Sequence, residues 1–246
     1  MWKSIKSNWQ LVIISVAIVI VALVEIINAL RPSESSFKMG AAKDSAWIPP
    51  SLFTDNLLEG KERRKVIYGE DIIANTSQYF GPHGSVAQIT NGMNCQNCHL
   101  NAGKKTWGNN YSAVFSTYPK LRERSGAIES IYKRVSDCFE RSLNGTAPDS
   151  NSKEYQAIYA YIKWIGQDVK KNEKPVGSGI EKLPVMDRAA DIVKGKNVYI
   201  MQCQSCHGAN GEGQLSLNGI SYEYPPLWGE HSYNVGAGLF RLSNFA

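Results

Sequence analysis

Two short segments of this chain place two cysteines and a histidine at the same spacing. Residues 95–99 read Cys-Gln-Asn-Cys-His, and residues 203–207 read Cys-Gln-Ser-Cys-His. In this pentapeptide the two thiols add to the vinyl groups of a haem, and the histidine that follows binds the iron. A Cys-x-x-Cys pair alone would also fit a zinc half-site or a redox disulfide, but the adjoining histidine, present twice, favours haem. We therefore expect two covalently bound haem c groups, attached at Cys95, Cys98, Cys203 and Cys206, with His99 and His207 on the irons.

One of the five cysteines, Cys138, is left over and has no partner for a disulfide within the chain. On a helix over 128–141, four apolar residues form a stripe with Cys138 at its edge. Arg134 and Arg141 lie beside it, four residues before and three residues after. Nearby cations stabilise a thiolate, and guanidinium groups bind anions through paired hydrogen bonds. Two interpretations stay open: a thiolate ligand with an anion site, or a buried structural thiol with arginines that bind haem propionates.

Several helices must position these residues. Apolar spacing predicts a helix over 59–74 before the first motif, the helix over 128–141 that carries Cys138, and a third over 152–164. A fourth helix, over 187–199, is capped by Asp187 and leads into the second motif. Strand signals are scarce. The predicted fold class is all-α, with two tandem class I cytochrome c-type domains.

Composition suggests how the chain is divided. Linker regions are rich in proline, glycine, serine or charged residues. Only 39 residues follow His207, so we expect the second domain to be completed by further residues or by another subunit. The expected order is a cytoplasmic N-terminus (1–8), a transmembrane anchor (9–30), a linker (31–50), the first cytochrome c domain (51–170), a second linker (171–184) and the second cytochrome c domain (185–246).

The expected anchor rests on an apolar segment near the N-terminus. Residues 11–24 carry no charge, and with the apolar residues around them they approach the ~20 residues that cross a bilayer. Lys3 and Lys6 precede the segment and favour a cytoplasmic N-terminus. We expect a single-pass protein of a bacterial inner membrane with its haem domains in the periplasm. A cleaved signal peptide is the alternative.

The formal net charge of +5 gives no nucleic-acid signature. Two basic patches, 61–65 and 120–141, are interpreted as solvated faces.

Three separated segments resemble one known family. Residues 134–145 read Arg-Val-Ser-Asp-Cys-Phe-Glu-Arg-Ser-Leu-Asn-Gly and resemble the cysteine-ligand segment of the thiosulfate dehydrogenases, which are dihaem cytochromes c. Residues 94–103 resemble the first haem site of that family, and residues 224–238 resemble the region after its second haem. The resemblance extends over about 67–241. The dihaem subunit of the sulfur-oxidising multienzyme system is similar more distantly.

This resemblance implies an enzyme that joins two thiosulfate ions to tetrathionate and releases two electrons. It implies that His99 and Cys138 bind the first iron, and that Arg134 and Arg141 position the thiosulfate near the Cys138 sulfur, which leaves the iron or reacts covalently during turnover. A thiolate ligand lowers the potential of a haem and a thioether raises it. Electrons would therefore pass from the first haem to the second, and then to an acceptor cytochrome or respiratory complex.

The chain departs from the family pattern at the second haem. No methionine follows His207, and Leu239 stands directly after the Gly-Ala-Gly segment. His231, the only later histidine, is interpreted as a surface residue, so the sixth ligand is left unassigned. The anchor and the short second domain favour an alternative function, a non-catalytic dihaem electron-transfer subunit of a respiratory or photosynthetic complex. The Cys138 segment favours the enzyme.

Overall fold

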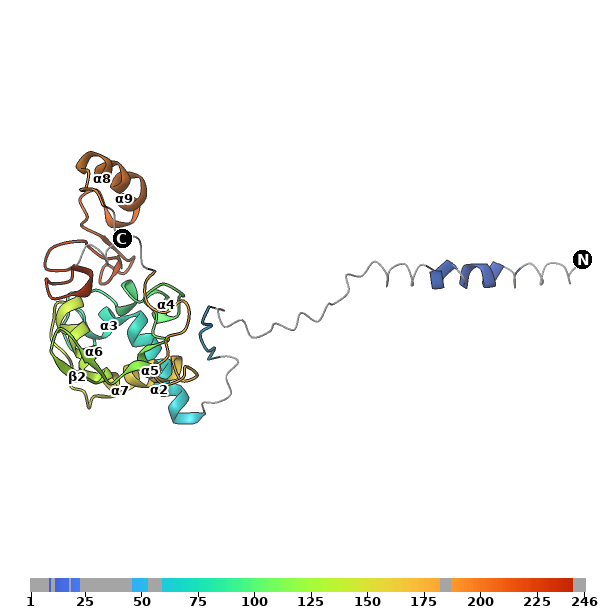
Figure 1. Ribbon diagram of the computed structural model, residues 1–246, viewed down its shortest axis with the longest axis horizontal. Helices are drawn as coiled ribbons and strands as arrows, with labels where there is room; N and C mark the ends of the chain where they lie inside the picture. Colours follow the sequence, from blue (N-terminus) through green and yellow to red (C-terminus); the bar gives the residue numbers. More distant parts are fainter. Residues whose placement is uncertain are drawn as a thin grey trace, which may run out of the picture. The chain divides into compact units, whose positions relative to one another are not determined.

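The structure of this chain is a computed structural model (Figure 1). It divides the chain into two units, residues 1–43 and 44–246, which we describe separately. The residues that it describes are 9, 12–17, 19–22, 46–52, 59–181 and 187–240.

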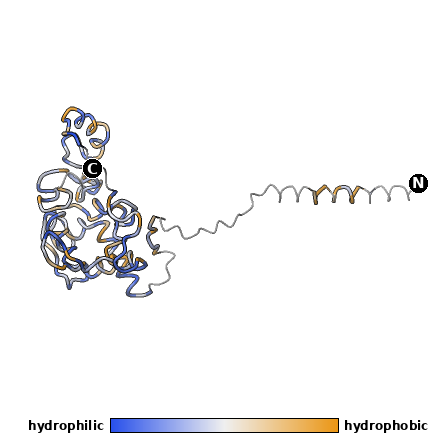
Figure 2. The backbone as a smooth tube through the Cα atoms, viewed as in Figure 1, coloured by the Kyte–Doolittle hydropathy of each residue, from blue (hydrophilic) through white to orange (hydrophobic). Residues whose placement is uncertain are grey.

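In the N-terminal unit, the described residues are helical and exposed, and most of them are hydrophobic (Figure 2). Half of the anchor expected over 9–30 lies outside the described residues. Within the described part of the chain, no helix has both the length and the apolar character needed to span a bilayer.

The core of the second unit forms around two long helices, α2 (Gly60–Ala74) and α7 (Lys153–Ile165). They pack closely because α2 has Gly69 at the contact, where a Cβ would lie 2.1 Å from the backbone oxygen of Ala157. Apolar residues of both helices are buried there, including Ile72 and Ile158. The hydroxyl of Tyr161 on α7 donates to the Ala102 carbonyl at 2.9 Å. The core thereby holds the loop that follows the first cysteine motif.

Short elements complete this unit. The α-helices are α3 (Thr76–Phe80), α4 (Leu100–Gly103), α5 (Val114–Thr117), α6 (Ile131–Asp137), α8 (Ile192–Val198) and α9 (Gln204–His207). The 3-10 helices are η1 (Cys95–Asn97) and η4 (Gly238–Phe240), and the π-helices are η2 (Cys138–Ser142) and η3 (Tyr199–Cys203). Two antiparallel hairpins pair β1 (Lys120–Arg122) with β2 (Ala127–Glu129), and β3 (Gln214–Leu215) with β4 (Tyr222–Tyr224).

The helix predicted over 128–141 is wrong in its first turn. Ile128 lies in β2, opposite Leu121, and is 74% exposed. The helix starts at Ile131, because the Ser130 side chain accepts a hydrogen bond from the Lys133 backbone and so caps the first turn. Ile128 is therefore no part of the apolar stripe beside Cys138.

The helix predicted over 187–199 also starts later, at Ile192. The cap is Asp191, whose carboxylate accepts from the Lys194 backbone at 3.0 Å, and not Asp187. By contrast, α7 matches the prediction over 152–164 to within one residue at each end.

Asparagine side chains connect the segment after the second motif to the first half of the unit. Asn91 donates to the Ser232 carbonyl at 2.9 Å, and Asn144 donates to the Glu230 carbonyl at 3.1 Å. In the opposite direction, Asn234 donates to the Glu140 carbonyl at 2.8 Å. These contacts hold the post-motif loop 230–238 on the first half of the unit, and the Asn234 contact places it against η2, the π-helix that begins with Cys138.

Candidate haem sites and anion site

The first cysteine motif is held by polar contacts to α3. The Asn94 side chain accepts from the Ser77 backbone at 2.8 Å, and the Asn97 side chain accepts from the Asn94 backbone at 2.7 Å. The Cys95 amide donates to the Thr76 hydroxyl at 3.0 Å. The residues around the cysteines therefore fix the turn that presents both thiols, a role that we did not predict for them.

His99 has the geometry of a metal ligand. Its Nδ1–H donates to the Asn109 carbonyl at 2.6 Å, which leaves Nε2 to bind a metal. Burial lowers the pKa of His99 to about 4. The imidazole is therefore neutral, which is the form that ligates iron.

His207, in the second motif, repeats this arrangement. Its Nδ1–H donates to the Pro225 carbonyl at 2.9 Å. The Tyr199 hydroxyl donates to the Gly208 carbonyl at 2.6 Å, and Gly208 takes a φ of +82° that a glycine adopts readily. A hydrogen bond from Nδ1 to a backbone carbonyl thus orients the histidine of each motif. In the second motif, the accepting carbonyl belongs to the segment just before Trp228.

Beside the first motif the structure encloses a cavity with an inner and an outer part. The inner part measures about 310 Å³ and is lined mainly by apolar side chains, together with Cys95, Cys98 and His99. The outer part measures about 690 Å³ and shares Cys98, His99 and Cys138 with the inner part. Volumes of this order hold large organic ligands. A haem c fits here, because both tethering sulfurs and a neutral histidine line one apolar cavity.

Cys138 and Arg134 lie together in this cavity, as predicted. Both line its inner and outer parts with His99. The negative charge of a Cys138 thiolate raises the pKa of Arg134, against the effect of burial. Cys138 is the first residue of the π-helix η2, and π-helices are rare and frequent at functional sites. The cavity therefore combines a possible sulfur ligand with a half-buried guanidinium.

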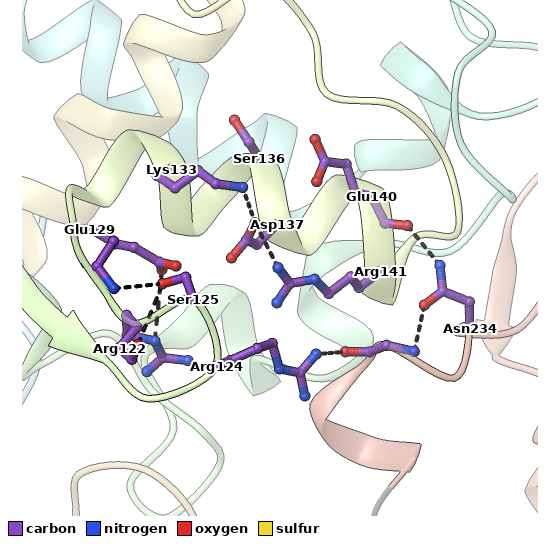
Figure 3. A network of polar contacts seen from close by, with 12 residues as sticks. Arg122, Arg124, Ser125, Glu129, Lys133, Ser136, Asp137, Glu140, Arg141 and Asn234 are labelled. Carbon is purple, nitrogen blue, oxygen red and sulfur yellow. Dashed lines mark hydrogen bonds and ion pairs between the residues drawn. The ribbon is translucent and has the colours of Figure 1, made fainter.

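Arg141 lies elsewhere than predicted, and does not line the cavity beside Cys138. Its guanidinium pairs with the buried carboxylate of Asp137 at 3.1 Å (Figure 3). Lys133 binds the same carboxylate at 2.5 Å. The reason is the shift to a π-helix at Cys138, which changes the helical spacing used for the prediction. Arg141 instead lines a separate small pocket with Arg122 and Arg124.

The basic patch over 120–141 is not only a solvated face, so that interpretation is corrected. Lys120, Arg122 and Arg124 line the outer part of the cavity. Lys120 and Arg122 are two residues apart on β1, and alternate residues of a strand point to the same side. The sequence does contain the pattern Lys-x-Arg before a turn with glycine, which would place both cations on one side of a strand. We did not predict a strand there, so we did not predict these two residues in the cavity.

At the second motif, the described residues assign no sixth ligand. Met201 is 68% exposed. His231 lies at the surface, and its Nε2 is 3.4 Å from a carboxylate oxygen of Glu230. The side chain of Leu239 lies outside the described residues.

Comparison with known proteins identifies two domains. A family model described as SoxA/TsdA, cytochrome c domain, matches residues 85–170, and a cytochrome c model matches residues 192–241. The thiosulfate dehydrogenase of Stutzerimonas stutzeri is 33% identical over 97% of this chain and 76% of its own length. The thiosulfate dehydrogenase of Psychrobacter arcticus is 39% identical over 62% of this chain and 46% of its own length.

A solved structure of a thiosulfate dehydrogenase is also similar to this chain in three dimensions. It is a thiosulfate dehydrogenase (TsdBA) from Marichromatium purpuratum in its as-isolated form. The match has a TM-score of 0.72 and 29% identity, and covers 81% of this chain. This chain spans 42% of that longer one.

Proposed function

Because this chain belongs to the thiosulfate dehydrogenase family of dihaem cytochromes c, we propose that it joins two thiosulfate ions to form tetrathionate. The reaction is 2 S₂O₃²⁻ → S₄O₆²⁻ + 2 e⁻: one sulfur–sulfur bond forms, two electrons leave, and no proton is exchanged. The two haem c groups, which would be held by Cys95, Cys98, Cys203 and Cys206, would supply the one-electron redox chemistry, and the electrons would leave to an acceptor cytochrome or respiratory complex.

The observation that carries this proposal is the cationic lining beside Cys138. The cavity that Cys138 lines is also lined by four cations and one carboxylate: Lys120, Arg122, Arg124 and Arg134, against Glu123. Two dianions about 5 Å apart repel each other by about 3 kcal/mol in bulk water, and by several times more near a protein. Cations in the cavity offset this repulsion and orient the two outer sulfurs toward each other. A pure electron carrier would use such cations only for haem propionates, and would not need them beside a thiolate ligand.

We assign His99 and Cys138 to the first iron and His207 to the second. Support comes from the hydrogen bonds that orient both histidines and from the position of Cys138 in the same cavity as His99. Arg134 is assigned to the thiosulfate that lies next to Cys138.

The experiment is turnover of the purified holoprotein with thiosulfate and a one-electron acceptor. We expect one tetrathionate, measured by ion chromatography, for every two electrons accepted. If both haems are reduced by dithionite but thiosulfate reduces neither, the proposal fails and the electron-carrier alternative takes its place.

We also propose that residues 9–30 anchor the protein in the inner membrane, with the cytochrome c domains at 51–170 and 185–246 in the periplasm. The uncharged segment 11–24 and the lysines before it support this placement. Cell fractionation tests it: the anchored protein stays with membranes after carbonate washing at its full mass. A soluble periplasmic product that lacks the segment would show a cleaved signal peptide instead.

A further inference from the structure

A second, smaller pocket adjoins the cavity beside Cys138. It has a volume of about 60 Å³, and its walls come from both halves of the second unit. Arg122, Arg124, Arg134 and Arg141 line it from the first half, and the backbone segment Gly236–Gly238 closes it from the loop after the second motif. Arg141 lines this pocket and not the larger cavity.

Two of the arginines are held in place before any ligand arrives (Figure 3). Asp137 pairs with the Arg141 guanidinium at 3.1 Å, and a guanidinium nitrogen of Arg124 donates to the Gly236 carbonyl. The Asn234 amide donates to the Arg141 carbonyl at 3.0 Å. These contacts fix the post-motif loop against η2, so the pocket depends on both halves of the unit.

The charge around the pocket favours an anion. Four guanidinium groups line it, against one carboxylate, Asp137, which Lys133 also neutralises at 2.5 Å. Two further carboxylates belong to the surroundings: an oxygen of Glu129 is 3.8 Å from Nε of Arg122, and Glu123 lines the adjoining cavity. With Lys133 included, five positive charges stand against three negative ones, Asp137, Glu129 and Glu123. Arginine binds oxyanions well because its planar guanidinium group donates two parallel hydrogen bonds to two oxygens.

The size of the pocket sets the class of anion. One water needs about 10–15 Å³ of this kind of volume, so a pocket of about 60 Å³ accommodates a group of about four to six water-sized atoms. Thiosulfate has five heavy atoms. A nucleotide or a second porphyrin would not fit.

We propose that this pocket is the binding site of the second thiosulfate, an inference that rests on the proposed function. The first thiosulfate lies in the larger cavity beside Cys138 and Arg134. Arg122, Arg124 and Arg134 line both spaces, so they stand between the two dianions and offset their repulsion. The outer sulfurs of the two ions then form the central bond of tetrathionate as two electrons leave to the one-electron acceptor.

The direct test locates a heavy analogue in crystals of the oxidised holoprotein. Selenate is a tetrahedral oxyanion with an anomalous signal, and we expect two selenium peaks, one beside Cys138 and one between Arg141 and the Gly236–Gly238 backbone. In Arg141→Gln the second peak disappears and the first stays. If Arg141→Gln does not fold, Arg124→Gln, at an exposed side chain that lines both spaces, still removes the second peak, and the first peak weakens at most. Arg64→Gln, at an exposed residue of α2 far from both spaces in sequence, keeps both peaks.

Kinetics give a second readout. Wild-type turnover rises with the square of thiosulfate concentration when that concentration is low. In Arg141→Gln the thiosulfate concentration for half-maximal rate rises roughly tenfold or more, as for loss of a hydrogen bond to a charged group. A single selenium peak beside Cys138, or a small-pocket peak that survives in both arginine variants, overturns the proposal.

The two proposals fail separately. Wild-type protein that makes tetrathionate but never binds selenate in the small pocket contradicts only the second site. Protein that binds selenate there but does not oxidise thiosulfate contradicts the proposed function, and the pocket remains a site for another small oxyanion.

Discussion

Cys138 is the residue on which the proposed chemistry depends most. It lines the same cavity as His99, and Arg134 beside it is half-buried. A sulfur ligand opposite a histidine would set the potential of the first haem, and a guanidinium next to that sulfur would bring an anion to it. Single substitutions separate these two roles.

Replacing Cys138 by alanine tests the ligand. We expect a changed absorption and electron paramagnetic resonance spectrum of the first haem, because one axial ligand is removed. Activity falls by more than about a hundredfold, since even outer partners of a metal site account for ten- to hundredfold. Cys138→Met is the matched variant: it keeps a sulfur ligand and raises the potential. A Cys138→Ala spectrum identical to wild type contradicts the assignment.

Replacing Arg134 by glutamine tests the substrate contact. We expect KM for thiosulfate to rise about tenfold to a hundredfold, because a hydrogen bond to a charged group contributes ~1.5–3 kcal/mol. The haem spectra stay as in wild type. Steady-state kinetics measure the change, with Arg64→Gln as the control on exposed α2. An unchanged KM together with altered haem potentials would instead assign Arg134 to a propionate.

At the scale of elements, three short structures build the cationic cavity. The hairpin β1–β2 carries Lys120 and Arg122, the capped helix α6 carries Arg134, and the π-helix η2 begins with Cys138. The segments α6 and η2 bury Ile131 and Phe139 in the same core as the packed pair α2 and α7. The precision of the site therefore depends on the close contact between these two helices.

Gly69→Ala tests that contact. The added methyl group would lie 2.1 Å from the Ala157 oxygen, and overpacking of a core costs ~1–3 kcal/mol. We expect a lower free energy of unfolding in urea, followed by circular dichroism. Gly195→Ala in α8 is the control, since its Cβ would meet no atom within 4 Å and alanine favours a helix by ~0.5–1 kcal/mol. Equal stability of Gly69→Ala and wild type would show that α2 and α7 are not tightly packed.

At the scale of the whole molecule, asparagine side chains hold the post-motif loop on the first half of the unit. The contact of Asn91 with the Ser232 carbonyl is buried at both ends. The loop in turn closes the small pocket through Gly236–Gly238. The two cytochrome c domains are therefore coupled through the site itself.

Asn91→Ala removes this buried hydrogen bond. Leaving a buried carbonyl without its donor costs ~1–3 kcal/mol, so we expect the post-motif loop to loosen. Limited proteolysis within 171–184 and the post-motif loop should become faster. Asn151→Ala, at an exposed residue, is the control. Cleavage at the wild-type rate in Asn91→Ala would show that the loop is held by other contacts.

Much of this protein was determined by its sequence alone. Covalent attachment needs cysteines and a histidine at one fixed spacing, so the two pentapeptides specify two haem c groups without any tertiary information. The separated motifs around Cys95, Cys138 and Trp228 likewise indicate the family. The helix over 152–164 followed from local apolar spacing and a local cap.

Only the tertiary structure decided how the anion site is built. The π-helix at Cys138 shifts Arg141 away from the cysteine, and a strand brings Arg122 toward it. Helical spacing derived from sequence assumes a regular α-helix. It cannot show that a strand from another part of the chain packs beside that helix. The walls of the small pocket are about 100 residues apart in the chain, so they meet only because the two halves of the unit pack on each other.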